Sequence, residues 1–143
     1  MEIEFTIIEA PWETEHARLL HVRKTVFVME QEVPEHLERD ADDSTSLHLL
    51  AIDREDRPIG TARLLPNGRI GRVAVLKEFR RKGIGAALMR RLISTARESG
   101  HRETTLHAQT HSIPFYQSMG YEVSGSVFEE AGIPHCEMRL SLR

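Results

Sequence analysis

The chain has 143 residues, a formal net charge of -3 and a pI of about 6.2, and 40% of its residues are hydrophobic. These values are typical of a soluble globular protein with one core, so we expect a single domain over residues 1–143. The acidic balance and the absence of a long apolar run argue against a nucleic-acid-binding protein and against a membrane protein. The lone cysteine, Cys136, excludes an intramolecular disulfide and, with no signal peptide apparent, favours the cytoplasm.

The first half of the chain predicts a strand, a helix and three further strands. β-branched residues predict a strand over 4–10, and apolar residues at helical spacing predict a helix over 13–33. The acidic stretch 35–44 is expected to be a short helix that runs into a loop. Three apolar runs separated by turn sequences then predict an antiparallel meander, over 46–53, 58–65 and 69–76.

The second half predicts the crossover that defines the fold. A long helix is expected from about residue 79, because Ile84, Leu88 and Leu92 recur on one face and Gly100 is a natural stop. The remaining predicted elements are a strand over 104–109, a helix over 113–120, and strands over 121–130 and 135–142. A strand, a helix and a strand in sequence form a right-handed parallel crossover. We therefore expect a mixed α+β fold, with a mostly antiparallel twisted sheet, one parallel pair and flanking helices.

Cations crowd the point where the long helix is expected to begin. Arg80, Arg81 and Lys82 are placed in its first turn, where the helix dipole is positive and acidic residues are the norm. Gly83 and Gly85 would let a ligand approach the unpaired backbone N–H groups of that turn. The pattern predicts an anion site, most naturally for a pyrophosphate. The alternative is a solvated basic helix start that binds nothing.

Two common phosphate-binding motifs do not match this stretch. A nucleotide-hydrolase loop requires G-x-x-x-x-G-K-[ST], which is absent from the chain. In a dinucleotide fingerprint, the stretch GIGAAL would place Leu88 where a glycine or alanine belongs. Neither motif therefore explains the predicted pyrophosphate site.

The stretch instead resembles [QR]-x-x-G-x-[GA], the acyl-CoA signature of the GNAT-type N-acetyltransferases. Arg80, Gly83 and Gly85 occupy the defined positions of that signature. The stretches VFVMEQEVP and EEAGIPHCEMRL are similar to the ElaA/YjcF-like branch of the family.

A second feature of this family, N-x-x-A-x-x-F-Y-x-x-x-G-[FY], lies downstream. The chain matches its aromatic pair at 115–116 and its glycine and aromatic residue at 120–121. Gln109 and Ser112 depart from the asparagine and the alanine of the motif. Glutamine keeps the amide but lengthens the side chain, which changes any contact that it makes to the pantetheine arm.

The resemblance implies direct transfer of an acetyl group from acetyl-CoA to a primary amine of a small molecule or a peptide. It implies that the parallel strands splay apart, that a backbone N–H of residues 73–75 binds the thioester oxygen, and that the amides of the helix start hold the pyrophosphate. Tyr116 is expected to protonate the leaving thiolate. The expected contacts of coenzyme A are Val73, Ala74, Val75, Arg80, Arg81, Lys82, Gly83, Ile84, Gly85, Ala86, Gln109, Ser112 and Phe115.

The reaction also needs a base, because only a neutral amine can attack the thioester. Deprotonating a lysine-like amine at pH 7 costs about 4.6 kcal/mol. We expect His135 to be the base, because histidine titrates near neutrality. Glu30, Glu32 and His107 are the other candidates.

Four further expectations concern metals, charge, assembly and chemistry. His107 and His111 lack the further ligands of a metal site, so we expect no metal. The acidic stretch 35–44 is expected to be a solvated loop, with steering of a cationic amine as the alternative. An edge strand over 135–142 would allow a homodimer. The alternative to an enzyme is a catalytically silent coenzyme A-binding sensor or interaction module.

Overall fold

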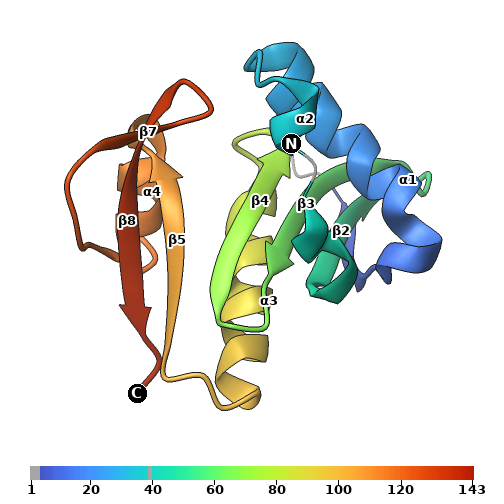
Figure 1. The fold of residues 1–143 in the computed structure, drawn as a ribbon. Coiled ribbons are helices and arrows are strands. Elements are labelled where there is room, and N and C mark those ends of the chain that lie inside the picture. Colours follow the sequence, from blue (N-terminus) through green and yellow to red (C-terminus); the bar gives the residue numbers. More distant parts are fainter. Residues whose placement is uncertain (1–3, 39) are drawn as a thin grey trace.

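A computed structural model describes residues 4–38 and 40–143 of the chain (Figure 1). The helices are α1 (Trp12–Arg23), which continues as a π-helical stretch (Lys24–Glu30), α2 (Glu35–Glu38), α3 (Ile84–Glu98) and α4 (Ile113–Gln117), with short 3-10 turns at Ala41–Thr45, Lys77–Phe79 and Thr110–Ser112. The strands are β1 (Phe5–Glu9), β2 (Leu47–Asp53), β3 (Pro58–Leu64), β4 (Arg69–Val75), β5 (Glu103–Gln109), β6 (Glu122–Val123), β7 (Phe128–Glu130) and β8 (Ile133–Ser141).

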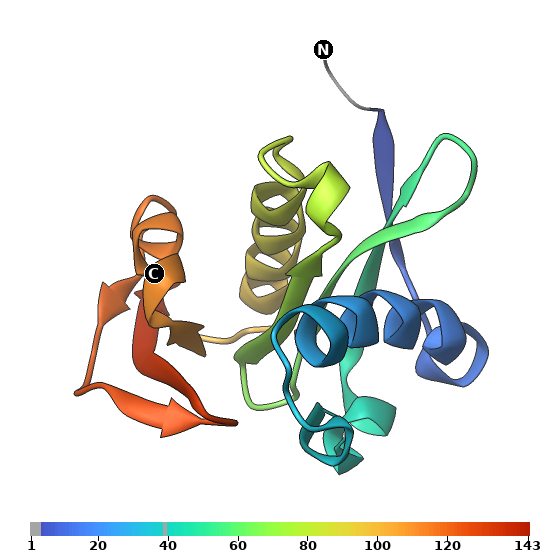
Figure 2. The same cartoon turned by 90° about the horizontal axis from the view of Figure 1, so that it is seen from above.

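The strands form one sheet in the order β1-β2-β3-β4-β5-β8-β6, and β7 also pairs with β8. Every pairing is antiparallel except that of β4 with β5, which joins only Arg69 to Thr105 and Ile70 to Leu106. Beyond these two pairs the strands diverge, which leaves β5, β7 and β8 as a separate leaf of the sheet (Figures 1 and 2). The predicted mixed α+β fold with one parallel, splayed pair is thus confirmed.

A β-bulge in β4 lies where β4 begins to diverge from β5. The register of β3 and β4 shifts between Thr61 and Arg63, and Arg72 of β4 has a φ of 51°. An extra residue in one strand reverses the alternation of its side chains. Ile70 packs in the core under α3 before the bulge, and beyond it Val73 and Val75 pack against that same core. The bulge therefore changes which side chains of β4 face each side of the sheet.

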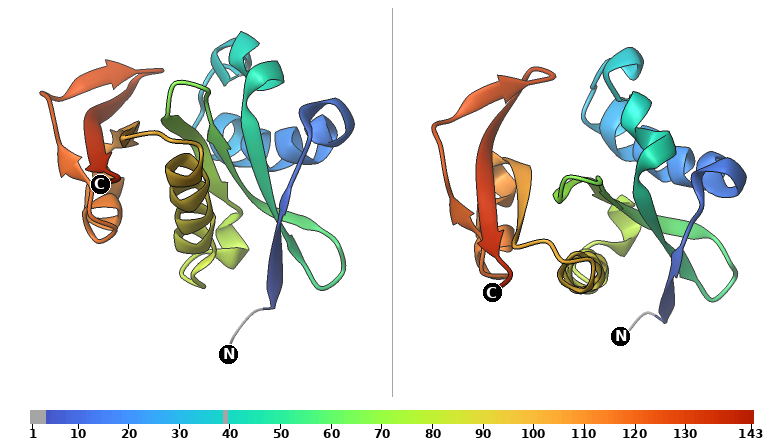
Figure 3. Two further views of the ribbon diagram at one scale, coloured as in Figure 1. Left: turned by 90° about the horizontal axis from the view of Figure 1, so that it is seen from below. Right: turned by 60° about the horizontal axis from the view of Figure 1, so that its bottom comes forward.

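Helices cover both faces of the first leaf of the sheet (Figures 2 and 3). The apolar stripe of α3, with Ile84, Leu88 and Leu92 fully buried, packs on β2, β3 and β4. Burying each such side chain contributes about 1.5–3 kcal/mol relative to exposure. On the opposite face, Val22 and Val26 pack against Ala74 of β4. The predicted core of the long helix is confirmed.

The first helix differs from its prediction in its second half. The β-branched residues after Arg23 lower the propensity for an α-helix, and the chain continues there in a wider π-helical spiral, in which Gln31 N–H donates to Val26 O at 3.0 Å. π-helical turns are rare and frequently lie at functional sites. This spiral places Phe27, Glu30 and Gln31 beside the splay.

Two expectations about the C-terminal strands are wrong. Residues 121–130 do not form one strand, because residues 125–127 lie outside the strands. Only β6, followed by a bond from Ser124 N–H to Glu137 O at 2.9 Å, and β7 pair with β8. The strand expected at the edge, β8, lies inside the sheet between β5 and the β6 and β7 pairings. Its backbone therefore has no free edge along these pairings for a second copy to join.

The acidic stretch is only in part the solvated loop that was expected. Glu38 and Asp43 are 2% and 3% exposed and lie against three arginines that come from α1, β3 and β4. The pairing distances are 2.8 Å for Arg23 Nη1 to Asp43 Oδ1, 2.8 Å for Arg63 Nη1 to Asp40 Oδ1 and 3.0 Å for Arg72 Nη2 to Asp40 Oδ2. Glu35 and Asp42 are exposed, so the buried pairing neutralises only part of the charge of this stretch.

Candidate active site

A cavity of about 890 Å3 fills the splay between β4 and β5. Its walls come from the α1–α2 region, the bulged half of β4, the start of α3, the end of β5 with α4, and the β7–β8 turn. All of the site residues that the sequence predicted line this cavity except Lys82, which is exposed to solvent. Of the other base candidates, Glu30 and His107 line it and Glu32 does not.

The start of α3 forms one end of the cavity. The helix begins at Ile84, so the three cations lie in the loop before it. The expectation that they lie in its first turn is therefore wrong. Gly83 caps the helix with a φ of 85°, a conformation that favours glycine. No side chain caps the helix, and the first backbone bond to Gly83 O comes from Ala87 N–H at 3.0 Å. The amides of Ile84, Gly85 and Ala86 are therefore available to an anion.

The three cations before α3 have different surroundings. The Arg80 guanidinium binds both carboxylate oxygens of Glu30 at 2.6 and 2.7 Å and donates to Val75 O at 2.9 Å. The hydrogen bond from Arg80 outweighs burial and holds the pKa of Glu30 below its usual value, which makes Glu30 a poor base. Arg81 is exposed at the rim of the cavity, and no ion pair to it occurs within the described part of the chain.

The backbone of β4 faces the splay. Leu76 N–H donates to Ile59 O at 2.9 Å, toward β3. Because amides alternate along a strand, the N–H of Val75 points the other way, into the space between β4 and β5, and Val73 lies two residues before it. This is the geometry needed to hold a polar group that lies along the diverging strands.

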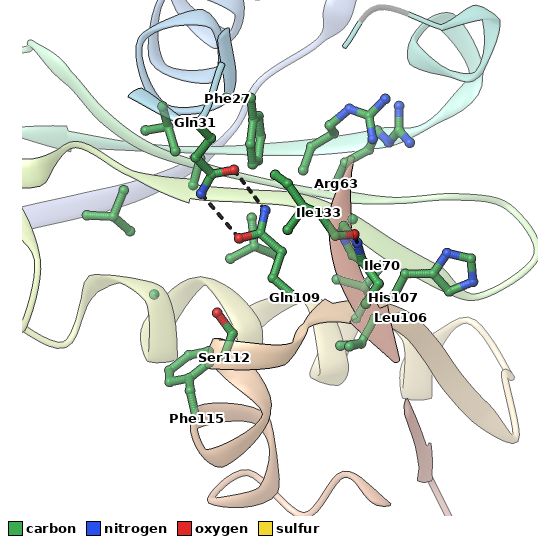
Figure 4. A pocket seen from close by; sticks show the side chains of 18 of the residues that line it. Phe27, Gln31, Arg63, Ile70, Leu106, His107, Gln109, Ser112, Phe115 and Ile133 are labelled. Carbon is green, nitrogen blue, oxygen red and sulfur yellow. Dashed lines mark hydrogen bonds between the residues drawn. The ribbon is translucent and has the colours of Figure 1, made fainter. Parts of the chain in front are cut away.

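Two glutamines bridge the splay. Gln109 Nε2 donates to Gln31 Oε1 at 2.8 Å, and Gln31 Nε2 donates back to Gln109 Oε1 at 3.3 Å. Figure 4 shows the two amides facing one another, with Ser112 and Phe115 on one side of the pair and His107 on the other. The longer side chain of Gln109 thus reaches a partner on the far wall. Sequence analysis did not identify Gln31, because the two residues are 78 positions apart.

Tyr116 lies on α4 in the cavity wall, with its ring 5.0 Å from that of Phe115 and 6.0 Å from that of Tyr121. Burial, and secondarily the proximity of Tyr121, raises the pKa of Tyr116 well above its ordinary value. Its hydroxyl makes no hydrogen bond to any residue in the described ranges. The side chain is therefore a protonated phenol at neutral pH and suits an acid rather than a base.

Histidines and an unexpected carboxylate form the other end of the cavity. His135 is 6% exposed, and its Nδ1 lies 2.6 Å from Ile133 O. Glu130 lies between His135 and His107, within 2.9 Å of His107 Nδ1. Sequence analysis identified both histidines but not Glu130. Its place in the EEAGIPH turn, five residues before His135, was the available signal.

The described residues hold no group of three or more histidine, cysteine or acidic side chains arranged for a metal ion. His111 is exposed on the turn after β5, whereas the His107 side chain is turned toward Glu130. Within the same ranges, none of the helices has the length and apolar character needed to cross a bilayer.

Comparison with known proteins points to one family. A family model described as "Acetyltransferase (GNAT) domain" matches residues 12–142. The uncharacterized N-acetyltransferase YjcF of Bacillus subtilis (strain 168) is 39% identical over 82% of this chain and 86% of its own. The crystal structure of Escherichia coli ElaA matches with a TM-score of 0.83 and 31% identity over 97% of this chain and 99% of that one. An acyl-CoA N-acyltransferase structure from Pseudomonas aeruginosa has a TM-score of 0.83 and 30% identity over 98% and 100% of the two chains.

Proposed function

Because the chain belongs to the GNAT acetyltransferase family, in its ElaA/YjcF-like branch, we propose that it transfers an acetyl group directly from acetyl-CoA to a primary amine. Coenzyme A is the acyl carrier that fits this family. The observation that carries the proposal is the cavity itself. It joins unpaired amides at the start of α3 to a cluster of proton acceptors on the far side of the diverging strands.

In this proposal, the diphosphate of the carrier lies on the amides of residues 84–86, and its pantetheine arm runs along β4. The N–H groups on the open side of β4 are fixed dipoles where the thioester oxygen would gain charge, which is the arrangement that stabilises an oxyanion. Tyr116 would protonate the departing thiolate, and His135 would take a proton from the attacking amine.

Arg81→Ala is expected to weaken acetyl-CoA binding about tenfold, because a charge-assisted hydrogen bond contributes about 1.5–3 kcal/mol. Lys82→Ala is the matched control, since Lys82 carries the same charge one residue later but lies outside the cavity. Titration calorimetry at two salt concentrations measures both effects. A loss that is equal in the two variants would contradict a specific role for Arg81.

The function is tested by incubating the protein with acetyl-CoA and a library of amines, with mass spectrometry of the products. An increase of 42 Da on one class of primary amine, dependent on the protein, is expected. If acetyl-CoA binds but no acceptor is acetylated, the chain is a carrier-binding module. If acetyl-CoA does not bind at all, the proposal fails.

A further inference from the structure

Glu130 of β7 lies between two histidines on the face of the sheet opposite α3. Its Oε1 accepts a hydrogen bond from His107 Nδ1 at 2.9 Å, and its Oε2 lies 3.9 Å from His135 Nε2. All three side chains line the cavity. The two histidines come from neighbouring strands, and the register of β5 with β8 brings them onto the same side as Gln109. The cluster thus faces the side from which an amine could meet a carrier bound at α3.

The hydrogen bonds around the cluster fix which nitrogen of each ring carries a proton. Arg69 Nη2 contacts both nitrogens of the His107 ring, whereas the ionised Glu130 Oε1 can only accept, so His107 Nδ1 carries the proton that it donates to Glu130. The His135 Nδ1 faces Ile133 O, which can only accept, so that nitrogen carries the proton and Nε2 keeps its lone pair. Glu130 Oε2 and His135 Nε2 are therefore two acceptors that face each other without a donor between them.

The carboxylate is charged at neutral pH. Burial alone would raise the pKa of Glu130, but the hydrogen bond from His107 and the nearby Arg69 guanidinium outweigh burial and lower it. The Glu130 side chain is 45% exposed toward the cavity and His135 is buried, so a donor that enters the cavity with more than one N–H or O–H group can satisfy both acceptors.

We propose that Glu130 Oε2 and His135 Nε2 together bind the acceptor nitrogen, each accepting one of the two N–H groups of a primary amine. This inference rests on the proposed acetyltransferase function. A nitrogen about 2.9 Å from both atoms would see them at an angle of roughly 85°, which the two N–H bonds of a tetrahedral amine can satisfy. The lone pair of the nitrogen then points away from both acceptors, into the cavity. Glu130 is thus a catalytic residue that selects primary amines, and His107 and Arg69 are positioning residues that hold it.

This pair of acceptors, Glu130 Oε2 and His135 Nε2, forms a seat for the amine. It also accounts for removal of a proton from the attacking nitrogen and for release of the product. Attack forms the C–N bond and breaks the C–S bond, and the thiolate takes a proton from Tyr116. The amine gives up its third proton to solvent when it binds, and after the attack the nitrogen, which is briefly positive, gives one of its two remaining protons to His135 Nε2. His135 is then a donor and can turn its charge toward Glu130, while the amide product keeps a single N–H group. The product therefore loses its seat as the histidine becomes charged. His135 then releases its proton to solvent, and the Tyr116 phenolate takes one from solvent, so both side chains return to their starting states.

The test compares Glu130→Gln with Glu129→Gln, which removes the neighbouring, exposed carboxylate of the same strand. Butylamine is titrated into protein with 15N-labelled histidine, and the Nε2 shift of His135 reports binding. We expect butylamine to bind the wild type and Glu129→Gln equally and to bind Glu130→Gln at least tenfold more weakly, since a hydrogen bond to a charged group contributes about 1.5–3 kcal/mol. N,N-dimethylbutylamine, whose ammonium form has a single N–H group and cannot satisfy both acceptors, is expected to bind the wild type severalfold more weakly than butylamine.

Calorimetry with acetyl-CoA separates this inference from the function beneath it. Glu130→Gln is expected to bind acetyl-CoA as the wild type does, because Glu130 contacts His107 and His135 rather than the start of α3, and this binding also shows that the variant is folded. If butylamine binds Glu130→Gln as tightly as the wild type, or does not perturb His135 in the wild type, the seat is refuted while the proposed function stands. If the wild type fails to bind acetyl-CoA, the proposed function fails irrespective of the amine results.

Discussion

Replacing Tyr116 by phenylalanine is expected to lower kcat about 10- to 100-fold and to leave the KM for acetyl-CoA nearly unchanged. The substitution removes the hydroxyl alone, and acid–base groups typically contribute factors of 10² to 10⁴. The phenol is protonated at neutral pH and can supply a proton to the strongly basic departing thiolate, while burial, which raises its pKa, makes it a weaker acid than a free tyrosine. Continuous detection of the released thiol, with any acceptor that the library identifies, measures the effect.

Tyr121→Phe is the matched control, because the same atom is removed from the adjacent ring. The Tyr121 hydroxyl is bonded to Thr104 Oγ1 at 2.6 Å and is buried behind the cavity wall, where burial raises its pKa to about 12. Its loss should cost about 1 kcal/mol of stability and leave turnover intact. Equal losses of turnover in the two variants, or none in Tyr116→Phe, would show that Tyr116 is not the acid.

Arg23→Met is expected to lower the free energy of unfolding by about 3–5 kcal/mol, the cost typical of breaking a buried ion pair from one side. Arg23 is 1% exposed, and its guanidinium binds Glu38 Oε1 at 2.5 Å and Asp43 Oδ1 at 2.8 Å. Methionine fills similar space but leaves the two carboxylates without that charge. Urea unfolding followed by circular dichroism measures the difference. Arg57→Met, which removes an exposed pair with Asp53, should cost less than about 1 kcal/mol.

The effect of Arg23→Met should depend on pH in a defined direction. Burial alone would raise the pKa of Asp43, but the hydrogen bonds and charges of Arg23 and Arg63 outweigh it and lower the pKa. A lowered carboxyl pKa contributes stability that is present above the unfolded value of about 3.9 and is lost as the pH falls through the folded value. The difference in the free energy of unfolding between the wild type and Arg23→Met should therefore become smaller below about pH 4. A gap that widens in acid would contradict this account of Asp43.

The order of the elements, and the glycines and cations before α3 where we propose that the carrier binds, could be read from local sequence. The stripe of Ile84, Leu88 and Leu92 has one helical period, and the turn sequences between the strands specify a meander. Gly83 adopts a positive φ, which glycine accepts without strain. These features depend on residues that are close in the chain, so their physics is visible in a short window of sequence.

The amine side of the cavity could not be predicted in the same way. Glu130 meets His107 across 23 positions, and only the register of β5, β8 and the short β7 brings them together. The pairing of Arg80 with Glu30 spans 50 positions and depends on the π-helical turn after α1. The spacing of the motif predicted Arg80 as an anion ligand. The sequence around Arg80 does not indicate that a carboxylate from another element, Glu30, forms an ion pair with its guanidinium.

The opposite placement of the α3 amides and of the Glu130–His135 pair has a kinetic consequence. Two substrates that reach one reaction centre from opposite faces of a sheet do not exclude each other. A desulfo analogue of the carrier should therefore inhibit competitively against acetyl-CoA but not against the amine, and double-reciprocal plots should intersect rather than run parallel.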